Sequence, residues 1–324
     1  MAKPHIVIIS PALANANNGN WQTARRWSRF LRKDYRVSIA VQWDGNHCDA
    51  MIALHARRSA SSIAAFSAAH TTLPLVVVLT GTDLYRDILT DADAQRSLQL
   101  ATHLVVLQPT GLEMLDPASR NKTRVIFQSA PSLKAINKHP ATPSRYFDVT
   151  MIGHMRNEKD PATFMHAAEF LQSGKIRLIH IGSALDPALG RLAEKTRQRY
   201  PQYQWLGNLS HAATRQRLKR SHLMAITSRM EGGGANVIIE AVTSGVPVLA
   251  SDIPGNRGML GEKYTGYFPA GDSLKLAQLI ERAAGDPEFY GRLQAQCAAR
   301  APLFAPERER ASLLELLENC FTQT

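Results

Sequence analysis

Two glutamates flank a glycine-rich stretch in the second half of this 324-residue chain. They are Glu231 and Glu240, and the glycines directly after the first are Gly232, Gly233 and Gly234. Apolar residues at helical spacing follow, so the glycines lead into a predicted helix. Such a loop offers free N–H groups and the positive end of a helix dipole to a phosphate, and carboxylates accept hydrogen bonds from sugar hydroxyls. The pattern indicates a phosphate and sugar site, with a tight packing turn as the alternative.

A second charged group follows the strand predicted at residues 147–152. It contains His154, Arg156 and Lys159. Cations that face a diphosphate stabilise the negative charge that it gains when a bond to it breaks. An exposed Arg156–Lys159 pair beside Glu158 is the alternative interpretation.

In the first half of the chain, polar residues follow several predicted strands. The carboxyl ends of parallel strands meet at one edge of a sheet, where doubly wound folds bind ligands. The side chains expected there are Asn18, Gly19, Asn20, Gln22, His55, Arg57, Arg58, Thr80, Gly81, Thr82 and Asp83. Two alternatives stay open: the asparagines cap their own loop, and the two arginines cap and solvate the start of a helix.

The elements that must position these residues form two α/β series. Apolar runs predict strands at 5–10, 36–41, 50–54, 75–79, 103–107 and 124–128, and then at 147–152, 177–181, 203–205, 223–227 and 246–250. A proline-containing stretch at about 129–144 separates the two series and reads as a linker. We therefore expect an N-terminal Rossmann-like domain over 1–144, a second over 145–305, and a terminal helix within 306–324.

The composition indicates which classes of ligand and partner to expect. The net charge of +11 favours an anionic ligand, and the scattered basic groups favour a phosphorylated small molecule over nucleic acid. Three cysteines without metal-like spacing suit a reducing cytoplasm, where we expect the protein to act. No apolar run approaches the roughly 20 residues that cross a bilayer, and the first residues do not read as a signal peptide, so no membrane partner is expected. The sequence does not indicate an oligomeric state.

Two further patterns are interpreted as structural. Asp91-Ala92-Asp93 has the spacing of a metal-binding D-x-D motif, but its surroundings read as a helix start, where acids suit the dipole. We therefore expect no metal. His166, His211 and His222 lie in polar helical stretches and are expected at the surface.

The stretch 228–258 resembles the donor-binding loop of retaining glycosyltransferases of the GT-B fold. The shared pattern is a glutamate, glycines, a Glu-Ala pair at 240–241, and G-x-P-V-x-A-S-D at 245–252. Eight residues separate the two glutamates here, against the usual seven, because of the third glycine. The resemblance implies that Glu240 holds the nucleotide ribose and that Glu231, displaced by the insertion, lies near the sugar.

Two other motifs carry the same resemblance. Residues 153–161 are similar to G-R-L-x-x-E-K-G, which implies that Lys159 clamps the donor diphosphate and leaves the choice between His154 and Arg156 open for the second cation. Thr80 stands where related enzymes carry the histidine of H-G-x-D, so that imidazole's role does not transfer. Catalytic roles fall to Arg156, Lys159 and Glu231. Further donor contacts are expected from His154, Ser183, Asn208, Leu209, the three glycines, Ala235, Asn236 and Glu240.

The first half of the chain carries a more specific resemblance than the donor-binding loop does. The strings SPALANANNGNWQTARRWSRFLR, VQWDGNHCDAMIALHARRSA and LTGTDLYRDI resemble selenosugar synthases of selenoneine biosynthesis. The resemblance implies two Rossmann-like domains with parallel sheets facing across a cleft, a terminal helix packing back across the hinge, and an enzyme that joins a UDP-sugar, expected to be UDP-N-acetylglucosamine, to selenophosphate without a cofactor. The polar edge of the first domain would then bind the acceptor. Transfer to an ordinary hydroxyl is the alternative, and a non-enzymatic nucleic-acid-binding protein is the alternative of another class.

Overall fold

The computed structural model describes residues 3–12, 19–133, 145–231 and 235–322. The chain divides into two compact units. Within the described residues, unit one comprises 3–129 and 306–322, and unit two comprises 130–231 and 235–305. Each unit is built on a six-stranded sheet in which every strand pair is parallel, so the expected α/β class is confirmed.

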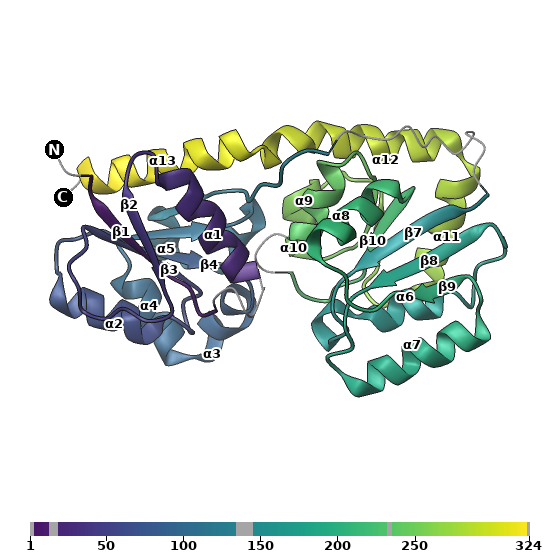
Figure 1. Cartoon of the computed structure of the whole chain (residues 1–324), viewed down its shortest axis with the longest axis horizontal. Coiled ribbons are helices and arrows are strands. Elements are labelled where there is room, and N and C mark those ends of the chain that lie inside the picture. The colour runs from purple at the N-terminus through teal and green to yellow at the C-terminus, as the bar shows by residue number, and fades with distance from the viewer. Residues whose placement is uncertain (1–2, 13–18, 134–144, 232–234, 323–324) are drawn as a thin grey trace. The chain divides into compact units, whose positions relative to one another are not determined.

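Unit one has the strand order β2-β1-β3-β4-β5-β6 (Figure 1). Its strands are β1 (His5–Ile9), β2 (Arg36–Ala40), β3 (Ala50–Leu54), β4 (Leu75–Leu79), β5 (His103–Val106) and β6 (Thr123–Val125). Its helices are α1 (Gly19–Leu31), α2 (Ala60–Ala69), the short π-helix η2 (Asp83–Asp87), α3 (Ile88–Thr90), α4 (Ala92–Leu100), the 3-10 helix η3 (Pro109–Met114), α5 (Pro117–Asn121) and α13 (Pro306–Thr322).

Both faces of this sheet are buried by helices. Successive residues of β1 alternate between two apolar clusters: Val7 and Ile9 pack with α2 and α4, whereas Ile6 and Ile8 pack with α1 and α13. Figure 1 shows these helix pairs on opposite sides of the strands. This burial explains the continuous apolar runs, because a strand covered on both faces has no polar side to alternate with.

The C-terminal helix α13 is anchored to unit one by a buried carboxylate. Glu309 is only 1% exposed. Its Oε1 accepts from Trp27 Nε1 at 2.6 Å, and its Oε2 accepts from Arg26 Nε at 2.8 Å and from the Ser129 hydroxyl. Since a buried charge is costly unless it is paired, these three donors make the contact specific for an acid at this position.

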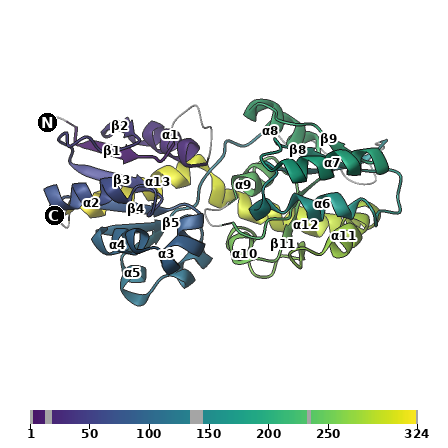
Figure 2. The ribbon, with the colours of Figure 1, turned by 90° about the horizontal axis from the view of Figure 1, so that it is seen from below.

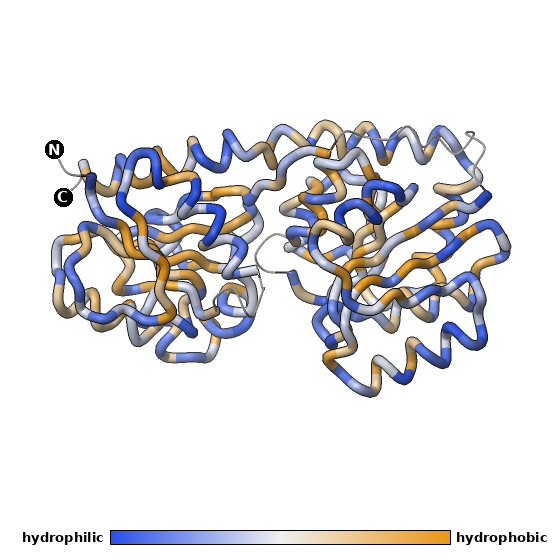
Figure 3. The backbone as a smooth tube through the Cα atoms, viewed as in Figure 1, coloured by the Kyte–Doolittle hydropathy of each residue, from blue (hydrophilic) through white to orange (hydrophobic). Residues whose placement is uncertain are grey.

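Unit two has the strand order β12-β11-β10-β7-β8-β9. Its strands are β7 (Phe147–Ile152), β8 (Ile176–Ile181), β9 (Tyr203–Trp205), β10 (Leu223–Ile226), β11 (Val248–Ser251) and β12 (Tyr267–Phe268). Its helices are η4 (Asn157–Lys159), α6 (Pro161–Ala167), α7 (Pro187–Arg199), α8 (His211–Arg220), α9 (Asn236–Val242), α10 (Pro254–Leu260), α11 (Ser273–Gly285), α12 (Pro287–Arg300) and η5 (Ala301–Phe304). Helices α6 and α11 lie side by side (Figure 2), and hydrophobic residues run along the strands (Figure 3).

Several element limits differ from those expected. The strand expected at 246–250 is β11, which begins only at Val248, because Val246 still donates its N–H to Ala241 and closes the end of α9. The strand expected at 124–128 already ends at Val125. His222 was wrongly expected at the surface in a helix: it follows α8, is buried, and stacks on Phe147. Residues 134–144 of the expected linker lie outside the described residues.

Among the described residues, none of the helices combines the length and the apolar character that crossing a membrane requires.

We expect Glu309→Ala to destabilise unit one by about 3 kcal/mol, because Trp27 Nε1 and the Arg26 guanidinium would lose their buried acceptor. Chemical denaturation measures this loss, and hydrogen exchange should increase in α13 and α1. The control is Glu315→Ala, which removes an exposed acid from the same helix. Equal unfolding midpoints for the two variants would contradict the anchoring role of Glu309.

Candidate active site

The carboxyl ends of β7 and β8 meet through two glycines. A Cβ atom on Gly182 would lie 2.0 Å from the carbonyl oxygen of Gly153, so only glycine permits this approach. The buried His180 contacts the same oxygen through Nε2 at 3.1 Å, and its burial lowers the pKa of the imidazole to about 4. A neutral histidine therefore holds the backbone from which the residues after β7 project.

His154 is fixed by this backbone. The Ser183 N–H donates to His154 Nδ1 at 3.0 Å, so a neutral imidazole carries its proton on Nε2. Desolvation, followed by the nearby charge of Arg156, lowers the pKa of His154. Near neutral pH, the positive charge in this pair is therefore carried by Arg156, whose guanidinium has no ion-pair partner within the described ranges.

Lys159 and Glu231 form an ion pair. Lys159 Nζ donates to Glu231 Oε1, and Ser228 Oγ donates to the same oxygen at 2.6 Å. The backbone at Lys159 is held by Thr227, whose hydroxyl donates to its carbonyl oxygen at 2.9 Å. A Cβ atom on Gly255 would lie 1.7 Å from the carbonyl oxygen of Glu231, so α10 also fixes the glutamate. The structure thus brings together two of the residues expected to be catalytic.

Glu240 contacts a residue that sequence reasoning left at the surface. His211, the first residue of α8, donates from Nε2 to Glu240 Oε1 at 2.7 Å. The glutamate side chain is 12% exposed and that of the histidine 58%. This hydrogen bond and the charge of Glu240 raise the pKa of His211, against desolvation and the charge of Arg215. No linear motif links His211 to Glu240; the packing of α8 on α9 does.

The remaining expected donor residues lie at the same edge of the unit-two sheet. Asn208 and Leu209 follow β9 after Gly207, whose carbonyl oxygen accepts from the Gly182 N–H at 2.8 Å. Ala235 precedes α9, and Asn236 is its first residue. Gly232, Gly233 and Gly234 lie outside the described residues.

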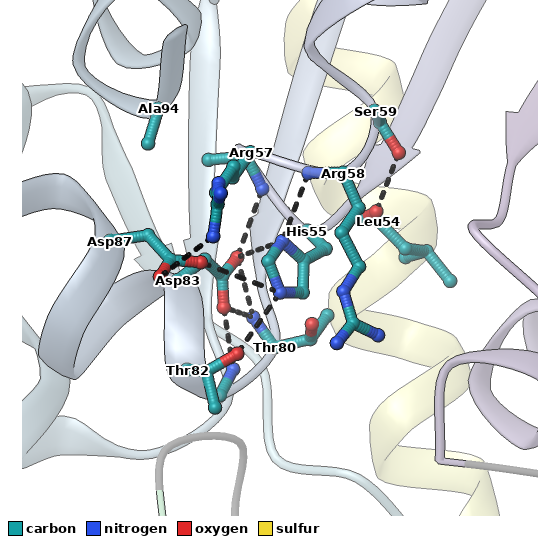
Figure 4. Close-up of polar contacts among 12 residues, drawn as sticks. Leu54, His55, Arg57, Arg58, Ser59, Thr80, Thr82, Asp83, Asp87 and Ala94 are labelled. Atoms are coloured by element: carbon teal, nitrogen blue, oxygen red, sulfur yellow. Dashed lines mark hydrogen bonds and ion pairs between the residues drawn. The ribbon is translucent and has the colours of Figure 1, made fainter. Parts of the chain in front are cut away.

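In unit one, Asp83 organises the loop after β4. Its fully buried carboxylate accepts N–H bonds from Ala56 at 3.0 Å, from Thr80 at 3.0 Å and from Gly81 at 2.7 Å. These bonds tie the carboxyl ends of β3 and β4 together (Figure 4). Asp83 therefore fixes the backbone of this loop, and its buried carboxylate does not face solvent.

His55 lies against this loop. Its φ of +77° is rare for a residue with a side chain, and such backbone strain concentrates at functional sites. Nδ1 accepts from the Arg58 N–H at 3.2 Å, and Nε2 lies 3.2 Å from Thr82 Oγ1 and 3.9 Å from Asp87 Oδ2. Desolvation is the main cause that lowers the pKa of His55, so the buried imidazole is neutral near pH 7.

The two arginines after β3 differ. Arg57 Nε pairs with Asp91 at 2.8 Å, and its Nη1 lies 3.8 Å from Asp87. The Arg58 side chain points away from this cluster in Figure 4, and its guanidinium has no hydrogen-bond or ion-pair partner in the described parts of the chain. Arg57 thus braces the loop, whereas the guanidinium of Arg58 is available to a ligand among the described residues of this edge.

Other expected residues of this edge lie at the start of α1. Gly19 begins the helix, and Asn20 and Gln22 fall in its first turn. Asn18 lies outside the described residues. The D-x-D spacing marks a helix start, as expected: Asp91 caps α4 by accepting from the Ala94 N–H. Over the described ranges, no three His, Cys, Asp or Glu residues are grouped to hold a metal ion.

Comparison with known proteins identifies the family. The profile described as glycosyl transferases group 1 matches residues 134–301, which is more than half of the chain. This chain belongs to the glycosyl transferases group 1 family. The resemblance to glycosyltransferases is thereby confirmed at the level of the family.

Relatives of this group 1 glycosyltransferase agree with that assignment. Glycosyltransferase 1 domain-containing protein 1 of Xenopus tropicalis is 26% identical over 195 residues, which are 60% of this chain and 54% of that protein. The chain thus matches about half the length of this curated relative. Anabaena HepE in complex with UDP-glucose superposes with a TM-score of 0.78 at 15% identity, over 98% of this chain and 100% of that one. Sucrose-phosphate synthase of Thermosynechococcus elongatus gives 0.79 at 17%, over 99% and 100%. These likenesses establish the GT-B fold.

The His211–Glu240 pair of this glycosyltransferase predicts a pH dependence. We expect NMR titration to give His211 a pKa above its ordinary value of 6.5, and Glu240→Gln to lower it. Because the folded pKa is raised, the pair's contribution to stability is complete below pH 6.5 and is lost as the pH rises through the folded pKa. Glu169→Gln, which removes the partner of His166, is the control. An unchanged His211 titration in Glu240→Gln would contradict the pairing.

Proposed function

We propose that this group 1 glycosyltransferase takes a UDP-sugar as donor at the carboxyl edge of the unit-two sheet. The observation that carries the proposal is the arrangement there of Arg156, Lys159, Glu231 and Glu240. Cations suit a diphosphate, and carboxylates suit ribose and sugar hydroxyls. The complexes of Anabaena HepE with UDP and with UDP-glucose support the choice of nucleotide.

Lys159 has a defined role in this proposal. Its charge is compensated by Glu231 in the structure. A bound diphosphate competes for the ammonium group and gains negative charge as its bond to the sugar breaks, so Lys159 stabilises the leaving group. Glu231 is then free to accept from a sugar hydroxyl. Arg156 supplies the second cation, because His154 has a lowered pKa.

For the acceptor we propose selenophosphate at the carboxyl edge of unit one. A small anion with a nucleophilic selenium needs a cation and N–H donors more than it needs a strong base. Arg58 offers the cation, and Thr80 and Thr82 offer a hydroxyl and an N–H, because the N–H groups of Thr80 and Gly81 already donate to Asp83. The similarity to selenosugar synthases supports the choice. Selenium attacks the anomeric carbon, the bond from that carbon to the diphosphate oxygen breaks, and UDP leaves with the bonding electrons. The first product carries selenium between the sugar and the phosphoryl group, and hydrolysis of the Se–P bond releases the selenosugar.

One observation weighs against the alternative, a hydroxyl acceptor. A hydroxyl must lose its proton during transfer, but the accepting nitrogen of the neutral His55 imidazole, Nδ1, is already engaged by the Arg58 N–H, so the proton lies on Nε2 beside Thr82 and Asp87. Selenophosphate needs no such base.

The reaction is tested by anaerobic incubation with UDP-N-acetylglucosamine, with and without selenophosphate. Mass spectrometry then follows UDP and the selenium isotope pattern on the sugar. We expect a selenium-containing sugar only when both substrates are present. UDP release without selenium transfer would exclude the proposed acceptor, and absence of both turnover and UDP binding would exclude the donor as well.

The two arginines give a matched test of the acceptor edge. We expect Arg58→Ala to raise the KM for selenophosphate about tenfold, because a charge-assisted contact to the anion is lost. Arg57→Ala should chiefly lower stability, since it removes the ion pair of Asp91 and one of the two guanidinium groups beside Asp87. Arg96→Ala, at an exposed position of α4, is the control. A KM that is unchanged in Arg58→Ala would remove Arg58 from the site.

A further inference from the structure

We infer that His211 is a positioning residue for the nucleotide: it holds one oxygen of the Glu240 carboxylate so that the other oxygen accepts from a ribose hydroxyl. This inference rests on the proposed UDP-sugar donor and adds a residue that no motif of the chain indicates.

The two carboxylate oxygens of Glu240 differ in their hydrogen bonding. Oε1 accepts from His211 Nε2, whereas Oε2 has no hydrogen-bond partner among the described residues. The side chain is mostly buried yet still reaches solvent. A carboxylate with one oxygen engaged and the other open is an acceptor with a set direction, and its complement is a hydroxyl donor. In a UDP-sugar the ribose offers two adjacent hydroxyls.

His211 is itself held in place by the start of α8. Ser210 caps this helix by accepting from the Ala213 N–H at 3.3 Å, which fixes the backbone beside the histidine. One turn further along, the buried Arg215 interacts electrostatically with Glu240 and donates from Nη2 to the Pro131 carbonyl oxygen at 2.7 Å. The carboxylate therefore accepts from a fixed imidazole and lies within the electrostatic influence of a fixed guanidinium.

A stability role alone explains this pair poorly. Exposed ion pairs contribute little to folding, and His211 is largely exposed. His166 and Glu169 make the ordinary case: both side chains are well exposed, and they lie three residues apart in and just after one short helix. Glu240 instead accepts through Oε1 from a residue of another helix, while Oε2 accepts no hydrogen bond from the described residues. A ligand hydroxyl at the edge of the sheet could donate to that second oxygen.

The test distinguishes a role of His211 in orienting Glu240 from a role in protein stability, because it changes the ligand as well as the protein. Dissociation constants of the full-length protein are measured by calorimetry for UDP and for 2′,3′-dideoxy-UDP, which lacks both ribose hydroxyls. We expect His211→Ala to weaken UDP binding about fivefold, which is less than the full loss of a hydrogen bond to a charged group because Glu240 itself remains, and to leave dideoxy-UDP binding unchanged. His211→Gln, whose amide can still donate, should recover part of the loss. His166→Ala is the matched control and should bind both ligands as the wild type does.

Each other outcome overturns the inference. Equal losses for UDP and dideoxy-UDP in His211→Ala would show a general structural effect, and melting temperatures would reveal it independently. Unchanged UDP binding in His211→Ala, with tight binding by the wild type, would remove His211 while the proposed donor stands. Failure of the wild type to bind UDP would remove the donor and the role of His211 with it.

Discussion

Parallel pairing is the constraint on which the rest of this structure depends. Every strand pair in both sheets runs in the same direction, so the carboxyl ends of neighbouring strands meet at one edge of each unit. Residues far apart in the chain are thereby collected: His55 follows β3 and Thr82 follows β4, while Lys159 follows β7 and Glu231 follows β10. The candidate chemistry of this glycosyltransferase is a property of those two edges.

Buried carboxylates organise each of these regions. Asp83 gathers backbone N–H groups from two strand ends, and Glu309 gathers donors from α1 and from Ser129 onto the terminal helix. Glu231 is held similarly by Lys159 and Ser228. An acid that is out of water must find donors or ions, so each carboxylate imposes one arrangement on its neighbours. Glu240 differs because its Oε2 accepts no hydrogen bond from the residues that the structure describes.

Pairing also separates the cations that support structure from those available to a ligand. Arg57 is engaged by Asp91 and Asp87, whereas Arg58 is not engaged within the described residues. In unit two, Lys159 is paired while Arg156 has no ion-pair partner in the part of the chain that the structure describes, and desolvation lowers the pKa of His154. The net charge of +11 thus says less about ligand binding than the positions of a few unpaired guanidinium groups.

The α/β class, most of the strands and the family could be predicted from the sequence, because the patterns that indicate them are local. A strand buried on both faces must be apolar throughout, and a glycine-rich loop between glutamates carries its pattern within a short stretch. The limits of elements were less accurate: the end of α9 depends on the hydrogen bond from Val246 to Ala241, which apolar periodicity does not encode.

Taken alone, the sequence determined two parallel α/β series, a net positive charge and the residue types at the strand ends. Only the tertiary structure decided which neighbours those residues meet. It paired His211 with Glu240, buried His222, and distinguished Arg57 from Arg58 although they are adjacent in the chain. The reason is physical: identity and spacing set the chemistry that a side chain can perform, whereas its charge state and free hydrogen-bonding capacity depend on groups that packing brings to it from distant segments.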